Sequence, residues 1–191
     1  FALALAENEL APGEGPLEGS REIRALISLA RMDLDEAEQR AIALLDVARQ
    51  TRAPMSLYMA ILLVGLVSYQ REDFVIARRY FAEGLADARR LELGPYKRWF
   101  LAPHAATFAT TDAAECVALL AAVETANRAD GWRPIAAVAR VADQAAAVCE
   151  ATLTSEELEQ AQERGAAMTI DEAIETSLDS LTAAHEALGS T

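Results

Sequence analysis

The apolar positions of this chain follow the spacing of amphipathic α-helices. In the stretch 34–48 they stand three or four residues apart, which places them on one side of a helix. They are Leu34, Ala37, Ala41, Leu44, Leu45 and Ala48. The stretches 74–88 and 170–181 repeat this spacing, whereas 54–70 is apolar on nearly every side and predicts the most buried helix. Runs of β-branched and aromatic residues are nearly absent, so the predicted fold class is all-α.

A short motif recurs three times at nearly constant intervals of 40 and 39 residues. It reads Asp33-Leu-Asp-Glu-Ala37, Asp73-Phe-Val-Ile-Ala77 and Asp112-Ala-Ala-Glu-Cys116. Asp is a preferred helix N-cap, and a small residue four positions later allows close packing. A fixed period in this range is typical of stacked helix pairs. We therefore predict a right-handed superhelical stack of antiparallel helix pairs; a compact up-and-down bundle is the alternative, and the preserved period favours the stack.

Proline and glycine residues indicate how the chain is divided. Their densest cluster, at 11–20, separates residues 1–19 from the rest. We interpret 1–19 as the end of a preceding helix followed by a Pro/Gly linker, and 20–188 as one helical-repeat domain that starts at Ser20 as an N-cap. Its units are expected at about 20–53, 54–95, 96–131 and 132–188, the last of them with a less regular helix pair at 134–149 and 154–164.

Local signals predict several helix ends within these units. Pro103 falls inside the first helix of the third unit and is expected to kink it or to delay its start. Gly165 is expected to follow a helix as its C′ residue. Two Thr–Glu pairs have the spacing of capping boxes; they are Thr154 with Glu157, and Thr169 with Glu172.

Composition agrees with closely packed helices and argues against a nucleic-acid surface. Apolar residues make up 52% of the 191 positions, yet 42 are alanine and only 6% are aromatic. The net charge is −13, whereas binding to nucleic acid needs clustered Lys and Arg. The stretch 51–100 carries eight bases against five acids and is the expected place for an anionic partner, while 151–191 carries nine acids and one base.

Cysteine usage and hydropathy predict a cytoplasmic protein without a membrane segment. Cys116 and Cys149 fit neither a disulfide framework nor the spacing of metal ligands, and each stands among alanines. The longest apolar run, around 59–67, is far shorter than the roughly 18 residues that a spanning helix needs. The opening Phe-Ala-Leu-Ala-Leu-Ala lacks the basic region of a signal peptide.

The second unit resembles a tetratricopeptide repeat. Gly65, Ala77, Phe81 and Gly84 occupy the spacing of its small and bulky positions, and Phe74 stands at an aromatic position. A standard unit has about 34 residues, so the longer interval here implies helices extended by roughly one turn. The Trp and Tyr of the motif are missing. The resemblance implies helix pairs whose first helices line a concave face.

A second resemblance spans about residues 20–181 and rests on the C-terminal half. Its residues are Leu119-Leu120-Ala-Ala-Val-Glu124, then Gly131, then Leu158-x5-Arg164-Gly165-x2-Met168-Thr169-x2-Glu172-Ala173-Ile174. This order resembles the end of the helical-repeat domain in LuxR-type and MalT-like transcriptional regulators, which belong to the bacterial signal-transduction ATPases. In that family the domain senses an inducer or a partner protein. The sequence shows neither a phosphate-binding loop nor a basic recognition helix, so the resemblance implies a fragment or a reduced relative.

The sequence offers no catalytic constellation. His104 and His185 are the only imidazoles, and neither has a Ser, Cys or carboxylate partner at a recognisable motif spacing. Paired acids lie in first helical turns, where the helix dipole favours them. We therefore predict a protein that is not an enzyme, without catalytic residues, metal ligands or a cofactor, in which His104 is capped or packed.

If the geometry of a tetratricopeptide repeat applies, the first helix of each pair lines a concave groove. The predicted groove residues are mostly apolar, with two aromatic rings and one cation; they are Met59, Leu62, Leu66, Tyr69, Arg98, Leu101 and Phe108. Such a wall would suit a small apolar ligand or a partner helix. The alternative is that these side chains form the core between neighbouring helix pairs, where Trp99 and Trp132 are also expected.

Two functions stay open on the sequence. The first is a non-catalytic ligand- or partner-sensing module of a multidomain bacterial transcriptional regulator, which would communicate with an ATPase domain of the same or another chain. The second is a stand-alone repeat adaptor that scaffolds a protein–protein interaction. Neither involves direct contact with nucleic acid or a membrane. The third Asp motif, with Cys116 at its small position and Pro103 in the preceding helix, is where the array becomes irregular and where function is expected.

Overall fold

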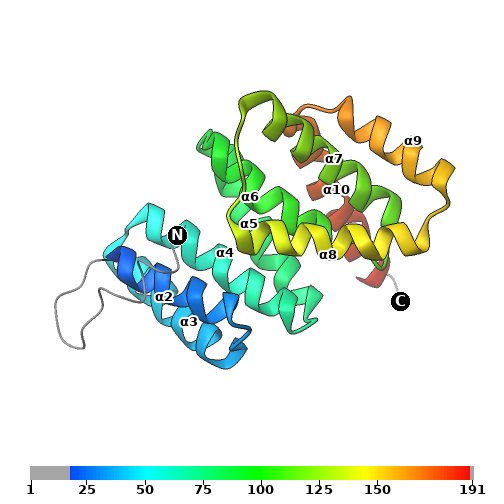
Figure 1. Cartoon of the computed structure of the whole chain (residues 1–191). Helices are drawn as coiled ribbons and strands as arrows, with labels where there is room; N and C mark the ends of the chain where they lie inside the picture. Colours follow the sequence, from blue (N-terminus) through cyan, green and yellow to red (C-terminus); the bar gives the residue numbers. More distant parts are fainter. Residues whose placement is uncertain (1–17, 190–191) are drawn as a thin grey trace.

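The computed structural model describes residues 18–189, with side chains over 21–94 and 96–179, and this part of the chain consists of helices joined by turns and short loops. It contains nine α-helices and no β-strand, which confirms the predicted all-α class (Figure 1). The helices are α2 (Glu18–Ala30), α3 (Leu34–Thr51), α4 (Pro54–Gln70), α5 (Phe74–Arg90), α6 (Gly94–Ala106), α7 (Ala113–Asp130), α8 (Ala136–Thr152), α9 (Ser155–Ala166) and α10 (Ile170–Gly189). Of the helix end and linker predicted over residues 1–19, only 18–19 are described, and they belong to α2; the side chain of His185 also lies outside the described residues.

The three Asp residues of the repeated motif are helix N-caps, as predicted. Asp33, Asp73 and Asp112 each accept a hydrogen bond through the side chain from the backbone N–H three residues later, at 3.2, 3.2 and 2.9 Å. These bonds satisfy one of the N–H groups that every helix start leaves without an intrahelical partner. Ser20 is not an N-cap, because α2 already begins at Glu18.

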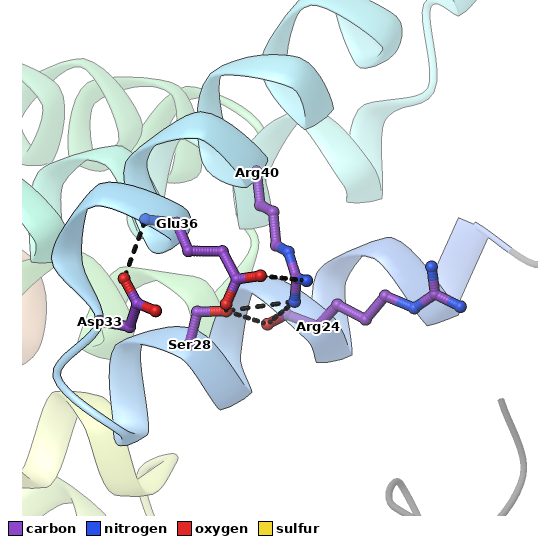
Figure 2. A network of polar contacts seen from close by, with 5 residues as sticks. All are labelled: Arg24, Ser28, Asp33, Glu36 and Arg40. Carbon is purple, nitrogen blue, oxygen red and sulfur yellow. Dashed lines mark hydrogen bonds and ion pairs between the residues drawn. The ribbon is translucent and has the colours of Figure 1, made fainter. Parts of the chain in front are cut away.

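A polar network surrounds the first of these caps and ties α2 to α3 (Figure 2). The buried Ser28 hydroxyl donates to Glu36 Oε2 at 2.8 Å, and Arg40 donates to the other Glu36 oxygen at 2.6 Å. Arg40 also donates to the carbonyl of Arg24 at 3.1 Å. The network therefore gives the buried Ser28 hydroxyl its hydrogen-bond partners between the two helices.

The first four helices end in turns of one kind. Each turn places a non-glycine residue in the left-handed region, with φ of 59°, 52°, 62° and 54° at Met32, Arg52, Glu72 and Glu92. The next residue donates its N–H to the carbonyl five positions back in all four turns, which is the main bond of the Schellman motif. The four left-handed residues are spaced by 20 positions, so one helix and its turn occupy half of the repeat period.

The core of this regular part is built from small residues facing large ones. The helix α4 is buried along residues 60–69, as its apolar sequence predicts. Gly65 of α4 faces Phe81 of α5, and a Cβ atom at Gly65 would lie 2.4 Å from the Phe81 ring. In the same way, a Cβ atom at Gly84 of α5 would lie 2.2 Å from the Phe100 ring of α6. Any side chain at either position would therefore have to displace an aromatic ring, which favours glycine at both.

The helix α6 is where the regular pattern ends. It begins at Gly94, so the late start predicted from Pro103 is wrong. Pro103 lies in its last turn, where it has no N–H to donate to the Trp99 carbonyl, and the helix ends three residues later, at Ala106. Residues 100–109 are all buried, even though His104 and Thr107 are polar.

The last three helices do not continue as the expected fourth pair. The helix α8 packs against α6 and α7 and also contacts α2 and α4, whereas α9 packs mainly against α7. The helix α10 contacts α5, α6 and α7. Figure 1 shows α8 (yellow) at the front of the view, α9 (orange) above it and α10 (red) at the back. The helix α6 is therefore enclosed by both earlier and later parts of the chain.

The helix α9 lies so close to α7 that its glycine is indispensable. A Cβ atom at Gly165 would lie 1.9 Å from the carbonyl oxygen of Ala118. Gly165 is inside the last turn of α9 and has no left-handed backbone, so its predicted role as a C′ residue is wrong. Both predicted capping boxes are present: Glu157 and Glu172 each accept from the backbone N–H and hydroxyl of the Thr three residues earlier.

Candidate ligand-binding cavity

The predicted groove residues fall into two environments. Most of them are buried in the core, with exposures of 0–9%; these are Leu62, Leu66, Tyr69, Leu101 and Phe108. Met59 is half-buried. Arg98 is different, because it lines a cavity between α6, α7 and α8. The structure thus brings one of the seven residues to a site with room for a ligand.

The helix α8 covers the helices that were expected to line a groove. It contacts α2, α4 and α6, which are the first helices of the three expected pairs. Four of its residues are spaced three or four apart and form a buried stripe toward these neighbours; they are Val138, Val141, Ala145 and Cys149. Tyr69 of α4 lies close to Cys116 and Cys149, and burial together with these two thiols raises its pKa to about 12.

The cavity that contains Arg98 has a volume of about 600 Å³, which is within the usual range for small-molecule sites. Its buried floor comes from one residue of each of the three helices, Ala102, Val123 and Val138. Exposed charged residues surround its opening: Glu124, Arg128, Arg133 and Asp143. The cavity thus has an apolar interior, and charged groups stand around its opening to solvent.

Among the described residues, Arg98 is the only cation on the inner wall, and its side chain is only 15% exposed. One terminal nitrogen pairs with the Asp130 carboxylate, and the other donates weakly, at 3.4 Å, to the Ala126 carbonyl and the Asn127 side chain. Its Nε–H group is buried and has no hydrogen-bond partner among the described residues. Such a donor is costly to leave unpaired, because it has lost its water.

The ring of Trp132 forms the wall next to Arg98. Gly131 adopts a left-handed conformation, with φ of 64°, and the Trp132 N–H donates back to the carbonyl of Asn127 at 2.9 Å. This turn directs the indole toward α6, where its centroid lies 5.8 Å from the Arg98 guanidinium carbon and 6.0 Å from the Trp99 ring. The indole N–H of Trp99 is also buried without a partner among the described residues.

A second cavity, of about 420 Å³, continues along α7 toward α9. The two cavities share Leu120, Glu124, Arg128 and Ala146, so they follow one another on the exposed face of α7. The second cavity lies between α7, α8 and α9. Arg128 and Glu124 form an ion pair one helical turn apart, on the ridge between the two spaces.

The buried His104 belongs to a separate polar cluster. Its Nδ1 lies 2.6 Å from the hydroxyl of Ser177 in α10, and both side chains have zero exposure. Arg78 donates to the Thr107 hydroxyl and carbonyl at 3.0 and 2.7 Å, and it lies over the Phe108 ring at 4.4 Å. Burial, with a smaller contribution from Arg78, lowers the pKa of His104 to about 3. His104 is therefore neutral at physiological pH and helps to hold α10 on α6.

The sequence predicts Trp99 and Trp132 as packing residues, and nothing in it connects them with Arg98. The Gly131-Trp132 pair was visible as a helix end followed by an aromatic residue. The position of α8 over α6 was not visible, and it is α8 that encloses the cavity. No local signal in the sequence links Ser177 with His104, which lie 73 positions apart.

Comparison with known proteins yields no match: no family model, no curated protein and no solved structure is significantly similar to this chain. Within residues 18–189, no helix combines the length and the apolar character required to cross a membrane. The described residues also contain no cluster of His, Cys, Asp or Glu suited to holding a metal ion.

Proposed function

We propose that this chain is a non-catalytic sensing module of a multidomain bacterial transcriptional regulator, built as a right-handed tetratricopeptide-like stack. Support for the stack comes from the three Asp-capped helices and the four turns of one geometry. The contacts of Gly65 with Phe81 and of Gly84 with Phe100 are the small-to-large packing expected of neighbouring helices in such an array.

The observation that carries the sensing role is the cavity of about 600 Å³ between α6, α7 and α8. Its apolar floor and the buried, incompletely paired Arg98 are the features of a site that binds and orients a small molecule. Because α8 forms one wall and contacts α2, α4 and α6, occupancy would stabilise α8 against the earlier helices. A ligand can change an equilibrium only through a difference in affinity between two states. The proposed states differ in how firmly α8 packs against α2, α4 and α6.

The direct test has two parts. Recovery of the whole reading frame should reveal an ATPase domain in the same chain or in an adjacent gene; a gene that encodes these residues alone, with no ATPase nearby, would overturn the regulator. Native mass spectrometry of the purified protein should detect a bound small molecule that denaturation releases. A protein that binds only other proteins in that experiment would instead be an adaptor.

A further inference from the structure

We infer that the cavity between α6, α7 and α8 selects a ring-containing, mostly apolar molecule that carries a hydrogen-bond acceptor oxygen, which the Arg98 guanidinium would bind beside the Trp132 ring. This inference rests on the proposed sensing function and specifies the chemistry of its ligand. It follows from two observations about the wall of the cavity.

The first observation concerns donors without acceptors. Arg98 and Trp99 are consecutive on α6, and each has a buried N–H group with no partner among the described residues. Both side chains lie beside the Trp132 ring, at 5.8 and 6.0 Å. Of the two, only Arg98 lines the cavity, and it does so with 15% of its side chain exposed. The terminal nitrogen of Arg98 that donates only at 3.4 Å can donate to a carbonyl or carboxylate oxygen on a ligand, whereas a ligand with donors alone offers it no acceptor.

The second observation concerns shape and charge. The floor consists of Ala102, Val123 and Val138, which offer no polar side-chain atoms, and Trp132 presents an aromatic surface beside them. Aromatic rings prefer offset or edge-to-face contacts with such a surface. The lining holds three arginines, Arg98, Arg128 and Arg133, against the acids Glu124 and Asp143, although Asp130 already pairs with Arg98. The site therefore tolerates a carboxylate but does not require one.

The experiment uses four naphthalene probes of similar size with the full chain in equilibrium dialysis. They are 1-acetylnaphthalene, 1-naphthoate, 1-ethylnaphthalene and 1-naphthylmethylammonium. The acetyl and ethyl probes differ by a carbonyl in place of a methylene group, so their affinity ratio isolates the acceptor. A hydrogen bond from a charged donor should give the acetyl probe an affinity about tenfold or more above that of the ethyl probe. The naphthoate should bind at least as tightly as the ethyl probe, and the ammonium probe should bind most weakly.

Variants assign the effect to the proposed atoms. Arg98→Met should abolish the preference for acetyl over ethyl and leave the affinity for the ethyl probe nearly unchanged. Arg98→Lys keeps the charge near Asp130 but lacks the guanidinium, whose several N–H groups can serve Asp130 and a ligand at once. It should therefore lose the preference as well, and it serves if Arg98→Met fails to fold. Arg133→Met is the matched control on the exposed rim and should retain the preference. Trp132→Leu should weaken all four probes by similar factors.

The outcomes separate this inference from the function on which it rests. Equal affinity for the acetyl and ethyl probes in the unchanged protein would overturn the role of Arg98 while leaving a sensing cavity in place. A preference that persists in both Arg98 variants would also overturn it. If no probe binds up to its solubility limit, the inferred ligand class is wrong. The regulator itself is then judged by its reading frame and its co-purifying molecules.

Discussion

The two halves of the molecule consist of similar helices but are held together in different ways. From α2 to α5, each helix ends in the same left-handed turn, and α4–α5 and α5–α6 pack through glycine against phenylalanine. From α6 to α10, the turns differ, and polar contacts join positions 73 and 74 residues apart, at His104–Ser177 and Lys97–Asp171. A repeated sequence can thus dictate repeated geometry through local contacts, whereas the irregular half depends on pairs that meet only after the chain has folded.

The largest effect is expected where the irregular half has no room to adjust. Gly165→Ala would place a methyl group 1.9 Å from a backbone oxygen of α7, which cannot move aside as a side chain can. We expect a loss of about 3 kcal/mol or more in the free energy of unfolding, measured with urea. Gly94→Ala is the control, since nothing lies within 4 Å of its added Cβ, and it should change stability by less than about 1 kcal/mol. Equal effects of the two substitutions would contradict the close contact between α9 and α7.

Acid should weaken the irregular half through His104. Its pKa is about 3 in the folded protein and 6.5 when unfolded. Between these values the unfolded chain binds more protons, so stability should fall as the pH decreases from 6.5 toward 3, by at most about 1.4 kcal/mol per pH unit. Glu115 acts in the opposite direction, because burial raises its pKa. The measurement is a set of urea titrations at several pH values on the unchanged protein and on His104→Gln. Both proteins contain Glu115, so its contribution cancels in the comparison. Parallel pH profiles of the two proteins would show that His104 does not destabilise the fold in acid.

In the regular half, the same type of substitution should be milder and repairable. Gly84→Ala would bring a Cβ atom to 2.2 Å from the Phe100 ring, but a ring can shift where a backbone cannot. We expect a loss of about 1–3 kcal/mol. Adding Phe100→Leu should recover part of that loss, so the double variant should be more stable than the sum of the two single variants predicts. Strict additivity in chemical denaturation would argue against direct contact between the two positions.

The smallest expected effect is a gain, and it tests the turns. Glu72 has φ of 62°, a conformation that costs a residue with a side chain about 1 kcal/mol more than glycine. Glu72→Gly should therefore raise the melting temperature by roughly 1–3 °C. Glu72→Ala removes the same charge without relieving the backbone, and it should not raise the melting temperature. A gain of the same size in the alanine variant would assign the effect to charge instead.

Local features of the fold could be predicted, and non-local ones could not. The Asp33, Asp73 and Asp112 caps act within one helical turn, so their spacing in the sequence was sufficient. The four left-handed turns could not be predicted, because glycine is the usual signal for that conformation and none of their residues is glycine; they are Met32, Arg52, Glu72 and Glu92.

The candidate site was harder to predict from the sequence, because its walls come from three helices. The pattern pointed to Arg98, but the side chains around it in the predicted groove are core, and the position of α8 follows from packing that no local spacing records. Gly165 shows the same limit. Its place near a helix end suggested a C-terminal signal, while its physical role is the approach of α9 to the Ala118 carbonyl.

The 20-residue spacing of the turns has a consequence for how this chain could change in length. The segment 33–72 begins and ends at turns of the same backbone geometry. Its deletion would join Met32 to Asp73, and its duplication would join Glu72 to a second Asp33. Each junction reproduces a left-handed residue followed by a capping aspartate. Recombination within the gene could therefore add or remove a unit and still join the helices by a turn that the fold already uses. The part from α6 onward lacks such equivalent junctions and would have to be inherited as a single block.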